Sequence, residues 1–449
     1  MARNVLVIGY ARSGAAVARL LINEGATVTV SDPQLDLEDS RVIALQDKGV
    51  TFTTEQGNDL LENVDVIVKN PGIPYSAPIL AEALRRGIPT EVEVVEAQKY
   101  ITGNWIAITG SNGKTTTTEM VAAVMRSVAN EQHKVVVAGN IGTPVSEVAP
   151  SLTAEDTLIT ELSSFQLWDM PTAHPHFAVV TNIFASHLNW HADRQEYIDA
   201  KMNITKNQTA DDYLLMNWDT EEWRELAQRS QAQIIPISRE ANSKDGAYEQ
   251  DGVLYFRDEA VMQADQLGVP GEHNIENALV AIAIGRLNGV PVKLISDVLE
   301  HFSGVEHRLQ FVREYAGRQI YNDSKATDIE ATQKALSGFK TPVVLLAGGL
   351  ERGDELQRLA PDFKQHVRAL VTFGQTGSRL AKIADEIGLP NVAVESAQTA
   401  FATAFDLSEA GDVILLSPAA ASWDQFPNFE TRGALFVKSV EDFIKAKEQ

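Results

Sequence analysis

The sequence predicts an α/β protein that consists of three consecutive α/β domains. Its 449 residues exceed what a single hydrophobic core usually covers, so several domains are expected. Short runs of β-branched and aliphatic residues alternate with helical patterns along the chain, as in parallel-sheet proteins. This alternation stops and restarts twice, after a charged stretch at 91–99 and after a Phe-Ser-Gly run at 302–304. We therefore expect domains at 1–97, 98–304 and 305–449.

The first domain opens with a strand–helix–strand pattern. An apolar strand is expected at 5–9, a helix at about 14–21 and a second strand at 27–32. This order is typical of a βαβ unit in a parallel sheet. A further buried strand is expected at 65–68.

The second and third domains repeat this alternation. In the second, strands are expected at 105–110, 134–138, 157–161 and 177–181, and a helix at about 274–288 precedes a Gly-Val-Pro turn. In the third, buried strands are expected at 342–347, 369–373 and 412–416.

The composition narrows the possible functions. A hydrophobic fraction of 44% and a charged fraction of 22% are ordinary for a globular protein, and no apolar run is long enough to cross a bilayer. The absence of cysteine excludes disulfides, Cys-ligated metals and a thiol nucleophile. A net charge of −23 argues against nucleic acid as a partner, because phosphates would be repelled. The first residues show no signal-peptide pattern, so we expect a cytoplasmic protein without membrane insertion.

A glycine-rich loop between an expected strand and an expected helix predicts nucleotide binding. The loop consists of Gly110, Ser111, Asn112, Gly113, Lys114, Thr115 and Thr116. Glycines let backbone amides approach phosphate oxygens, and the helix N-terminus adds a favourable dipole. Lys114 is expected to neutralise the β- and γ-phosphates, and Thr115 to bind Mg²⁺. Ile108 replaces the first glycine of the full pattern, but the flanking elements favour ATP or GTP binding over an incidental turn.

Six segments follow one another in the order found in a known family. They are Thr-Gly-Ser-Asn-Gly-Lys-Thr-Thr at 109–116, Gly-Asn-Ile-Gly at 139–142, Glu-Leu-Ser-Ser-Phe-Gln-Leu at 161–167, Gly-Glu-His-Asn at 271–274 with Asn277, Asp-Ser-Lys-Ala-Thr at 323–327 and Ser-Pro-Ala-Ala-Ala-Ser-Trp-Asp-Gln-Phe at 417–426. Together they resemble the Mur ligases, and the first is also similar to the loop of folylpolyglutamate synthetases. The last segment resembles that of the family members that add D-glutamate.

The resemblance implies an ATP-dependent, amide-forming ligase of peptidoglycan precursor synthesis. Its architecture would be a UDP-binding Rossmann-like domain, a central P-loop ATPase domain and a C-terminal Rossmann-like domain that binds the amino acid. The expected substrates are ATP, D-glutamate and UDP-N-acetylmuramoyl-L-alanine, which react through an acyl phosphate. ATP would act with Mg²⁺ at two sites, and we expect a monomer.

The resemblance also implies a set of metal-binding and catalytic residues, namely Lys114, Thr115, Glu161, His187 and Lys201. The carboxylate of Glu161 suits Mg²⁺, although a carboxylate at a helix start is the alternative. Beside His187, Ser186 and Asn189 stand where family aspartates are frequent, and His191 is a rival ligand. Lys201 aligns with the family lysine that carries a carbamate, whereas its own context indicates a solvated helix lysine.

Three further groups of residues follow from the resemblance. The ATP group is Asn274, Asn277, Arg308, Asp323 and Lys325, with adenine near the asparagines and the ribose near Asp323. The asparagines lie three apart on one helical face, although Asn274 could instead cap the helix, and the other three could form interdomain salt bridges. The UDP-substrate group is Ala11, Arg12, Ser13, Gly14, Asp32, Gly72 and Asn140. The D-glutamate group is Thr327, Arg352, Ser422, Trp423 and Phe429, in which Arg352 replaces the family lysine that follows the Gly-Gly turn.

Other functions stay open at this point. Another Mur ligase or a folylpolyglutamate synthetase would keep the chemistry and change the substrate. The glycines at 9–14 with Asp32 would fit an NAD-dependent oxidoreductase, although they lack the dinucleotide spacing and that function leaves the phosphate loop unexplained. A regulatory protein gated by a nucleotide would bind ATP but release no substrate-dependent phosphate.

Overall fold

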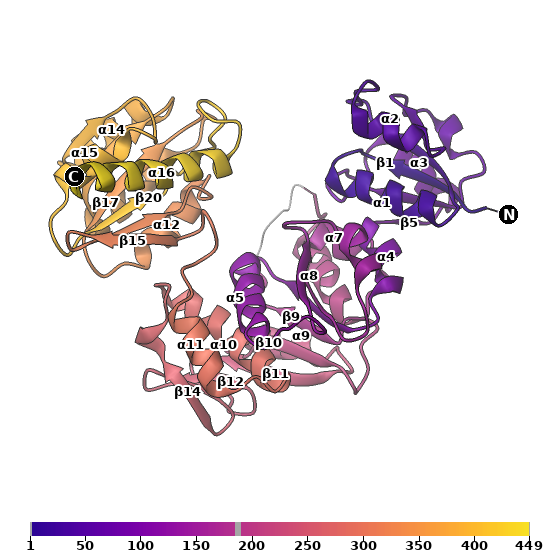
Figure 1. Cartoon of the computed structure of the whole chain (residues 1–449), viewed down its shortest axis with the longest axis horizontal. Coiled ribbons are helices and arrows are strands. Elements are labelled where there is room, and N and C mark those ends of the chain that lie inside the picture. Colours follow the sequence, from indigo (N-terminus) through magenta and orange to yellow (C-terminus); the bar gives the residue numbers. More distant parts are fainter. Residues whose placement is uncertain (1, 185–189, 449) are drawn as a thin grey trace. The chain divides into compact units, whose positions relative to one another are not determined.

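The strands form three separate sheets in the computed structural model, which describes residues 2–184 and 190–448 (Figure 1). The chain divides into two compact units, Met1–Asp265 with Glu276–Val298 and Gln266–Ile275 with Leu299–Gln449. The α/β class and its three sheets confirm the fold class expected from the sequence. The domain boundaries at 97 and 304 stay a prediction.

The N-terminal sheet has the order β3-β2-β1-β4-β5 and is parallel throughout. Its strands are β1 (Asn4–Ile8), β2 (Thr27–Ser31), β3 (Thr51–Thr53), β4 (Val66–Lys69) and β5 (Thr90–Glu91). Its helices are α1 (Arg12–Asn23), α2 (Ser40–Gln46) and α3 (Pro78–Arg86), with the short 3-10 helix η1 (Asn58–Leu61). Successive β1 side chains alternate between faces, so Val5 and Val7 join the core that includes α1, and Leu6 and Ile8 the core that includes α3.

The central sheet has the order β14-β13-β12-β11-β10-β9-β6-β8-β7, in which β12 to β14 are antiparallel and the others parallel. Its strands are β6 (Asn104–Thr109), β7 (Val135–Gly139), β8 (Thr157–Glu161), β9 (Phe177–Val180), β10 (Tyr213–Asn217), β11 (Gln233–Ser238), β12 (Ala247–Gln250), β13 (Val253–Phe256) and β14 (Glu259–Gln263). The α-helices of this region are α4 (Glu93–Ala97), α5 (Lys114–Arg126), α6 (Val145–Val148), α7 (Ser164–Trp168), α8 (Arg194–Met202), α9 (Glu221–Ala227), α10 (Glu272–Leu287) and α11 (Val292–Glu300). The 3-10 helices are η2 (Gln98–Tyr100), η3 (Ala149–Ser151), η4 (Asn203–Thr205) and η5 (Ala264–Gln266). The carboxyl ends of β6, β8 and β9 are neighbours, so Gly110, Glu161 and Thr181 meet at one edge.

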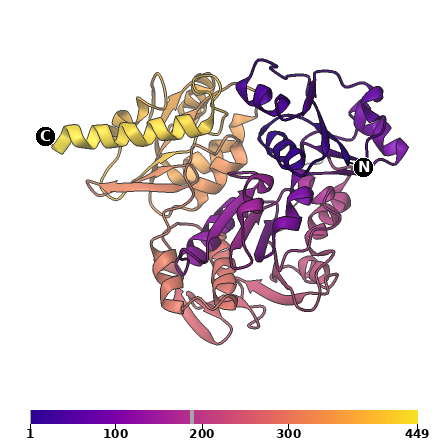
Figure 2. The same ribbon diagram turned by 45° about the vertical axis from the view of Figure 1, so that its right-hand side comes forward.

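The C-terminal sheet has the order β15-β16-β20-β17-β18-β19 and is parallel except for β15. Its strands are β15 (Gln310–Tyr315), β16 (Arg318–Asn322), β17 (Val343–Gly348), β18 (Val367–Phe373), β19 (Asn391–Ala393) and β20 (Val413–Leu416). Its helices are α12 (Ile329–Ser337), η6 (Leu356–Leu359), α13 (Ala360–His366), α14 (Gly377–Ile387), α15 (Ala400–Leu407) and α16 (Phe429–Glu448). The first four contribute to a core on one face, and α15 with the long helix α16 covers the other (Figure 2).

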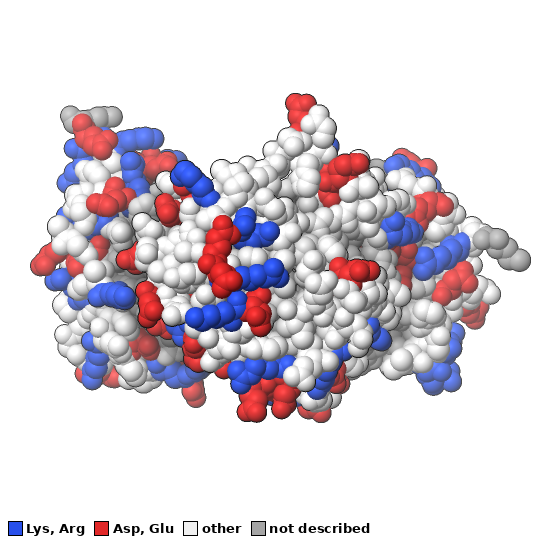
Figure 3. Space-filling model, turned by 90° about the horizontal axis from the view of Figure 1, so that it is seen from below, with Lys and Arg blue, Asp and Glu red and all other residues white. Residues whose placement is uncertain are grey.

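Charged side chains of both signs are scattered over the surface. On the face that Figure 3 shows, Lys and Arg lie interspersed with Asp and Glu, so the excess of acidic residues does not form one uniform acidic face there. Among residues 2–184 and 190–448, none of the helices combines the length and apolar character that a bilayer span requires.

Candidate active site

The glycine-rich loop follows β6 and leads into α5 as the sequence predicts. Gly110 has a φ of +148°, and a Cβ there would lie 1.9 Å from the Thr181 hydroxyl, so only glycine fits. Lys114, the first residue of α5, donates to the carbonyl oxygens of Gly110 at 2.7 Å and Ser111 at 3.0 Å. Two residues that the sequence analysis missed hold the loop. The side-chain oxygen of Asn182 accepts from the backbone amide of Asn112 at 2.9 Å, and the Thr181 hydroxyl donates to the backbone carbonyl of Asn112 at 2.7 Å.

Glu161 lies beside this loop as the last residue of β8. Its Oε2 accepts from the Thr115 hydroxyl at 2.7 Å, and its Oε1 accepts from the Asn140 amide group at 2.7 Å. The alternative of a helix-start carboxylate is therefore wrong, because α7 begins only at Ser164. Thr115 and Glu161 together present hydroxyl and carboxylate oxygens, the donor types that a magnesium ion prefers.

Lys201 is almost completely buried, with 1% of its surface exposed, so the reading as a solvated helix lysine is wrong. Its Nζ donates to the Gly110 carbonyl at 2.9 Å and lies 4.7 Å from the centre of the Tyr197 ring. Burial, and then the nearby charge of Lys114, lower the pKa of Lys201 well below its ordinary value. Tyr197 also contacts the phosphate loop, since its hydroxyl lies 2.9 Å from that of Ser111. The spacing of Tyr197 and Lys201 on α8, four residues apart, is a signal that could have identified this tyrosine.

His187, Ser186 and Asn189 lie outside the described residues. Their neighbour His191 is described and fully buried, and its Nε2 lies 3.0 Å from the Ser164 hydroxyl. Its ring stacks on Phe165 with the centroids 5.7 Å apart. These contacts hold His191 against the start of α7.

A small hollow on the first unit borders the phosphate loop. It is lined by Val180, Thr181, Asn217, Ile237, Glu276, Asn277 and Val280. Asn277 accepts from the Thr117 hydroxyl at 2.9 Å, and a Cβ on Gly113 would meet its Oδ1 at 2.7 Å. With a volume of about 10 Å³, the hollow has room for no more than about one water molecule, so it is not itself a nucleotide pocket. Asn274 is the third residue of α10, so the proposal that it caps this helix is wrong.

Asp323, Arg308 and Lys325 belong to the second unit. Asp323 follows β16 and accepts from the Ser417 hydroxyl at 2.8 Å and from the Leu309 backbone amide at 3.1 Å. Burial raises the pKa of Asp323 to about 7, although Ser417, Leu309 and Arg308 act in the opposite direction. The Lys325 ammonium lies 4.0 Å from the centre of the Phe429 ring.

Four residues of the D-glutamate group lie on loops at the carboxyl ends of the C-terminal strands, and Phe429 begins α16. Arg352 donates to the Thr327 carbonyl at 2.9 Å, so these two members of the group are brought together. Ser422 is buried, whereas Trp423 is 68% exposed and is among the most accessible large hydrophobic side chains described. The backbone carbonyl oxygen of Phe429 accepts a hydrogen bond from the Ser324 hydroxyl at 2.8 Å.

Arg432 organises these loops and was missed by the sequence analysis. It lies on α16 with no exposed surface and donates to the carbonyl oxygens of Ser324 at 2.8 Å and Ala420 at 3.0 Å. A third, longer bond reaches the Gly348 carbonyl at 3.4 Å. Burial lowers the pKa of Arg432 to about 10, which leaves the guanidinium charged at neutral pH. One cation thus connects the loops that follow β16, β17 and β20.

The UDP-substrate group lies mainly at the N-terminal sheet. Ala11, Arg12, Ser13 and Gly14 form the start of α1, and a Cβ on Gly14 would lie 2.0 Å from the Gly9 carbonyl. Asp32 follows β2 and accepts from the Tyr10 amide at 2.7 Å. Gly72 donates its amide to the Asn70 side chain at 3.1 Å. Asn140 lies apart from this group, beside Glu161, at the central sheet.

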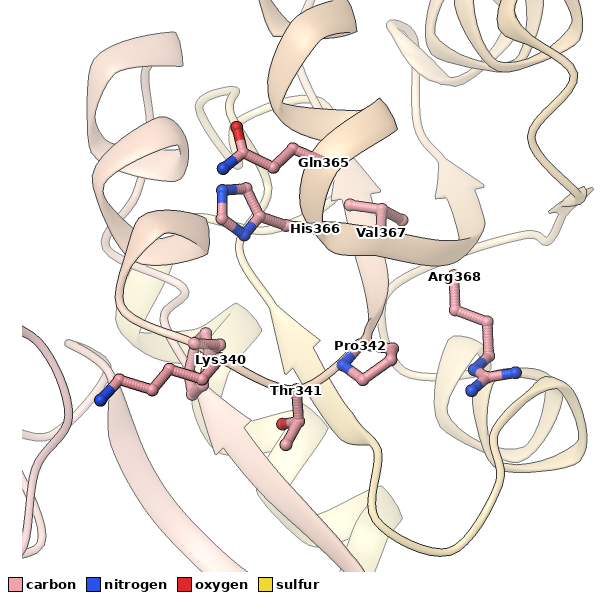
Figure 4. A pocket seen from close by; sticks show the side chains of 8 residues that line it. Lys340, Thr341, Pro342, Gln365, His366, Val367 and Arg368 are labelled. Carbon is pink, nitrogen blue, oxygen red and sulfur yellow. The ribbon is translucent and has the colours of Figure 1, made fainter.

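A separate hollow of about 350 Å³ lies on the C-terminal sheet, at the edge opposite the loops that Arg432 connects. It is formed by the segments that precede β17 and β18, namely 339–342 and 365–368. In Figure 4 the side chains of Lys340 and Arg368 extend in different directions from it. Arg368 is occupied by ion pairs with Asp412 and Glu409, so the hollow presents no convergent set of charged groups.

Three family models match successive stretches of the chain. They are the MurD-like N-terminal domain of Mur ligases over 3–92, the Mur ligase middle domain over 108–285 and the Mur ligase glutamate ligase domain over 307–420.

Full-length relatives are also similar. The chain is 49% identical to the UDP-N-acetylmuramoylalanine--D-glutamate ligase of Lactiplantibacillus plantarum and 50% identical to that of Limosilactobacillus fermentum. Each alignment covers 100% of this chain and 98% of the relative.

Solved structures of lower identity share the fold. A MurF from Acinetobacter baumannii matches with a TM-score of 0.61 and 18% identity, covering 96% of this chain and 93% of that one. The UDP-N-acetylmuramate-alanine ligase from Thermotoga maritima matches with a TM-score of 0.56 and 18% identity, covering 98% and 100%.

Proposed function

The chain belongs to the Mur ligase family, and we propose on that basis that it joins D-glutamate to UDP-N-acetylmuramoyl-L-alanine using ATP. The observation that carries the proposal is the 49–50% identity, over the whole chain, to ligases named for that reaction. An oxidoreductase or a regulatory protein gated by a nucleotide would not account for this identity. Another Mur ligase remains the alternative that an experiment must exclude.

The reaction brings two anions together. The L-alanyl carboxylate attacks the γ-phosphorus of ATP, the bond to the bridging oxygen breaks, and ADP leaves an acyl phosphate behind. The amine of D-glutamate then attacks the acyl carbon, loses a proton and displaces inorganic phosphate. Positive charge and backbone amides must therefore surround the transferred phosphoryl group. The loop at 110–116 supplies the amides, and Lys114 at the start of α5 supplies the charge.

Oxygen donors beside the loop fit a magnesium ion. The Thr115 hydroxyl and the Glu161 carboxylate lie 2.7 Å apart, so both reach one point next to the proposed phosphate site. A magnesium ion held there would neutralise phosphate charge. We assign a second ion to His187 and Lys201, the latter as a carbamate.

The surroundings of Lys201 support carbamylation. A neutral amine is the nucleophile that adds to carbon dioxide, forming an N–C bond and releasing a proton. Burial and the charge of Lys114 favour the neutral amine by lowering the pKa of Lys201. After the addition, the carbamate is an anion close to the ammonium of Lys114. With ¹³C-bicarbonate, the wild-type protein is expected to show a carbamate resonance that Lys201→Met lacks; the same resonance in both would reject Lys201 as the site.

We assign the remaining residues by substrate. The ATP nucleoside and phosphates would meet Asn274, Asn277, Arg308, Asp323 and Lys325. The UDP substrate would meet the start of α1 with Asp32, Gly72 and Asn140. D-Glutamate would meet Thr327, Arg352, Ser422, Trp423 and Phe429. The corresponding domains are 1–97, 98–304 and 305–449.

The cellular setting follows from the proposed reaction. Its product is a nucleotide-linked precursor of peptidoglycan, so we place the protein in the cytoplasm, in cell-wall synthesis and therefore in cell shape and division. We propose that it acts as a monomer with small-molecule substrates and without nucleic acid.

The decisive experiment is an ADP- or phosphate-release assay with a panel of amino acids. Release is expected only when ATP, UDP-N-acetylmuramoyl-L-alanine and D-glutamate are all present. Turnover with glycine or L-lysine but not with D-glutamate would reject the assignment and favour another Mur ligase. ATP hydrolysis that ignores both other substrates would favour a regulatory protein.

A further inference from the structure

Lys69 stands at the point where the N-terminal sheet reverses its strand order. It ends β4 and pairs with Ile8 of the parallel strand β1. From β1 the sheet adds β2 and β3 on one side, and from β4 it adds β5 on the other side. In open parallel sheets, ligands bind in the crevice at the carboxyl ends of such a strand pair. The loops that leave β1 and β4 are those to which we assign the UDP substrate, at 9–14 and 70–74.

The two loops are in contact with each other. The Asn70 amide donates to the Ile8 carbonyl at 2.8 Å, and a Cβ on Gly9 would lie 3.0 Å from the Asn70 Cβ. A shift of the 70–74 loop would therefore change the space available at the start of α1. Its position is a condition for both halves of the proposed UDP site.

The Lys69 side chain lies beneath the 70–74 loop and has no exposed surface. Its ammonium donates to the carbonyl oxygens of Pro71 at 3.4 Å and Ile73 at 3.3 Å. These bonds are long, so they hold the loop only if the ammonium is itself held in place. Because the side chain is buried, it cannot contact the substrate directly.

Asp169, which belongs to the region of the central sheet, holds the ammonium of Lys69 in place. The Asp169 Oδ2 lies 2.9 Å from Lys69 Nζ, and the two groups form an ion pair without a well-aligned hydrogen bond. Only 3% of the Asp169 side chain is exposed. Its Oδ1 accepts from the Tyr75 hydroxyl. The rings of Tyr75 and Trp190 lie 5.3 and 5.7 Å from the ammonium. Asp169 directly follows α7, the helix that starts three residues after Glu161.

A buried ion pair of this kind is a poor source of stability. Removing two charges from water costs about as much as their attraction returns, and apolar pairs of similar size often serve as well. Its directional contacts, by contrast, restrict where the loop can lie.

We propose that Lys69 is a positioning residue for the UDP-linked substrate. Lys69 holds the 70–74 loop in the conformation that binds this substrate, and through Asp169 it fixes the loop relative to the end of α7. The inference rests on the proposed function, because the substrate of these loops is assigned there. It extends that function by a residue that touches no reacting group.

The test compares Lys69→Met with the double variant Lys69→Met/Asp169→Asn. The first leaves an unpaired buried carboxylate and can lower stability, whereas the second removes both charges and is expected to recover most of the wild-type melting temperature. Both are expected to weaken binding of UDP-N-acetylmuramoyl-L-alanine, measured by calorimetry without ATP, by about tenfold or more. The KM for that substrate should rise equally, while the KM values for ATP and D-glutamate stay within about twofold.

Lys99→Met is the matched control. Lys99 forms an ion pair at 2.6 Å with Glu24, the residue that directly follows α1. This ion pair also joins the N-terminal domain to the segment before the central sheet, but it contacts neither UDP loop. Its substrate affinities should match those of the wild type. A well-folded double variant with wild-type affinity for the UDP substrate would overturn the inference, and so would an equal rise in all three KM values.

The same measurements separate the inference from the proposed function. If the UDP substrate binds and the double variant weakens it, but D-glutamate gives no turnover, the proposed reaction fails and the role of Lys69 stands. If turnover is normal and the variants bind normally, the reaction stands and the role fails. If the wild type does not bind the UDP substrate at all, both are rejected.

Discussion

Arg432 donates two hydrogen bonds to Ser324, one from Nε to the side-chain oxygen at 3.0 Å and one from Nη2 to the carbonyl oxygen at 2.8 Å. Ser324 lies between Asp323 and Lys325, which we assign to ATP, and three residues before Thr327, which we assign to D-glutamate. The buried guanidinium therefore lies behind the proposed site without entering it, and its neighbours depend on it for their position.

Replacing Arg432 with Met should affect both stability and D-glutamate use. The carbonyl oxygens of Ser324 and Ala420 would lose their donors, which is expected to cost about 1–3 kcal/mol in urea unfolding. The KM for D-glutamate should rise by about tenfold or more, because small displacements at a site are costly. Lys438→Met is the control, since Lys438 lies on the same helix in an exposed ion pair and should change stability by less than about 0.5 kcal/mol. Unchanged stability and KM in Arg432→Met would contradict the assigned role.

Lys114→Ala should abolish turnover while leaving the UDP substrate bound. Lys114 supplies the charge at the proposed phosphate site, so its loss is expected to lower kcat by about 10³-fold or more. The proposed UDP loops lie on another sheet, and affinity for that substrate should stay near the wild-type value. Calorimetry and the phosphate assay check the two statements. Loss of both properties would indicate misfolding or an incorrect division of the domains.

Gly110→Ala should damage the phosphate loop through backbone conformation and steric overlap. The φ of +148° is rarely adopted by alanine, and the new Cβ would lie 1.9 Å from the Thr181 hydroxyl. ATP affinity is expected to fall by about tenfold or more, as measured with a fluorescent nucleotide. Gly252→Ala provides the comparison, because Gly252 also has a positive φ but open space around it. Its cost should be about 1 kcal/mol in stability with no change in ATP affinity.

Glu91→Gln should change how stability depends on pH. Burial and the neighbouring Glu96 raise the pKa of Glu91 to about 8, while the ion pair of Arg3 with both carboxylates acts in the opposite direction. The folded state therefore favours protonated Glu91, so the wild type loses stability as the pH rises from the ordinary carboxyl range towards 8.

The variant cannot ionise at position 91, so its melting temperature should exceed that of the wild type increasingly as the pH rises. We expect a gain of about 2–4 °C near pH 9 and little difference near pH 5 in thermal unfolding scans. Glu62→Gln, at an exposed position, should show a difference that does not vary with pH. A constant difference for Glu91→Gln as well would contradict the shared burial of the two carboxyl groups.

Local patterns in the chain were enough to predict the phosphate loop and several strands of each sheet, but not the antiparallel strands β12 to β15. The β-branched runs at 5–9 and 105–110 correspond to β1 and β6, because a buried parallel strand needs a continuous apolar segment. Gly110 to Thr116 could be recognised because the glycines, the lysine and the threonine that hold a phosphate are adjacent in sequence. Membership of the family also followed from motifs of this kind, each contained in about ten residues or fewer.

The surroundings of single polar residues could be seen only in the folded chain. Lys201 has the sequence context of a surface lysine, and its burial depends on α8 lying against the loop after β6. Lys69 and Asp169 are one hundred positions apart, and Arg432 reaches residues more than one hundred positions away, so neither set of contacts leaves a periodic signal. Hydrophobic periodicity reports which face of an element is buried, but the partner of a buried charge is set by chain topology, which brings distant segments to one point.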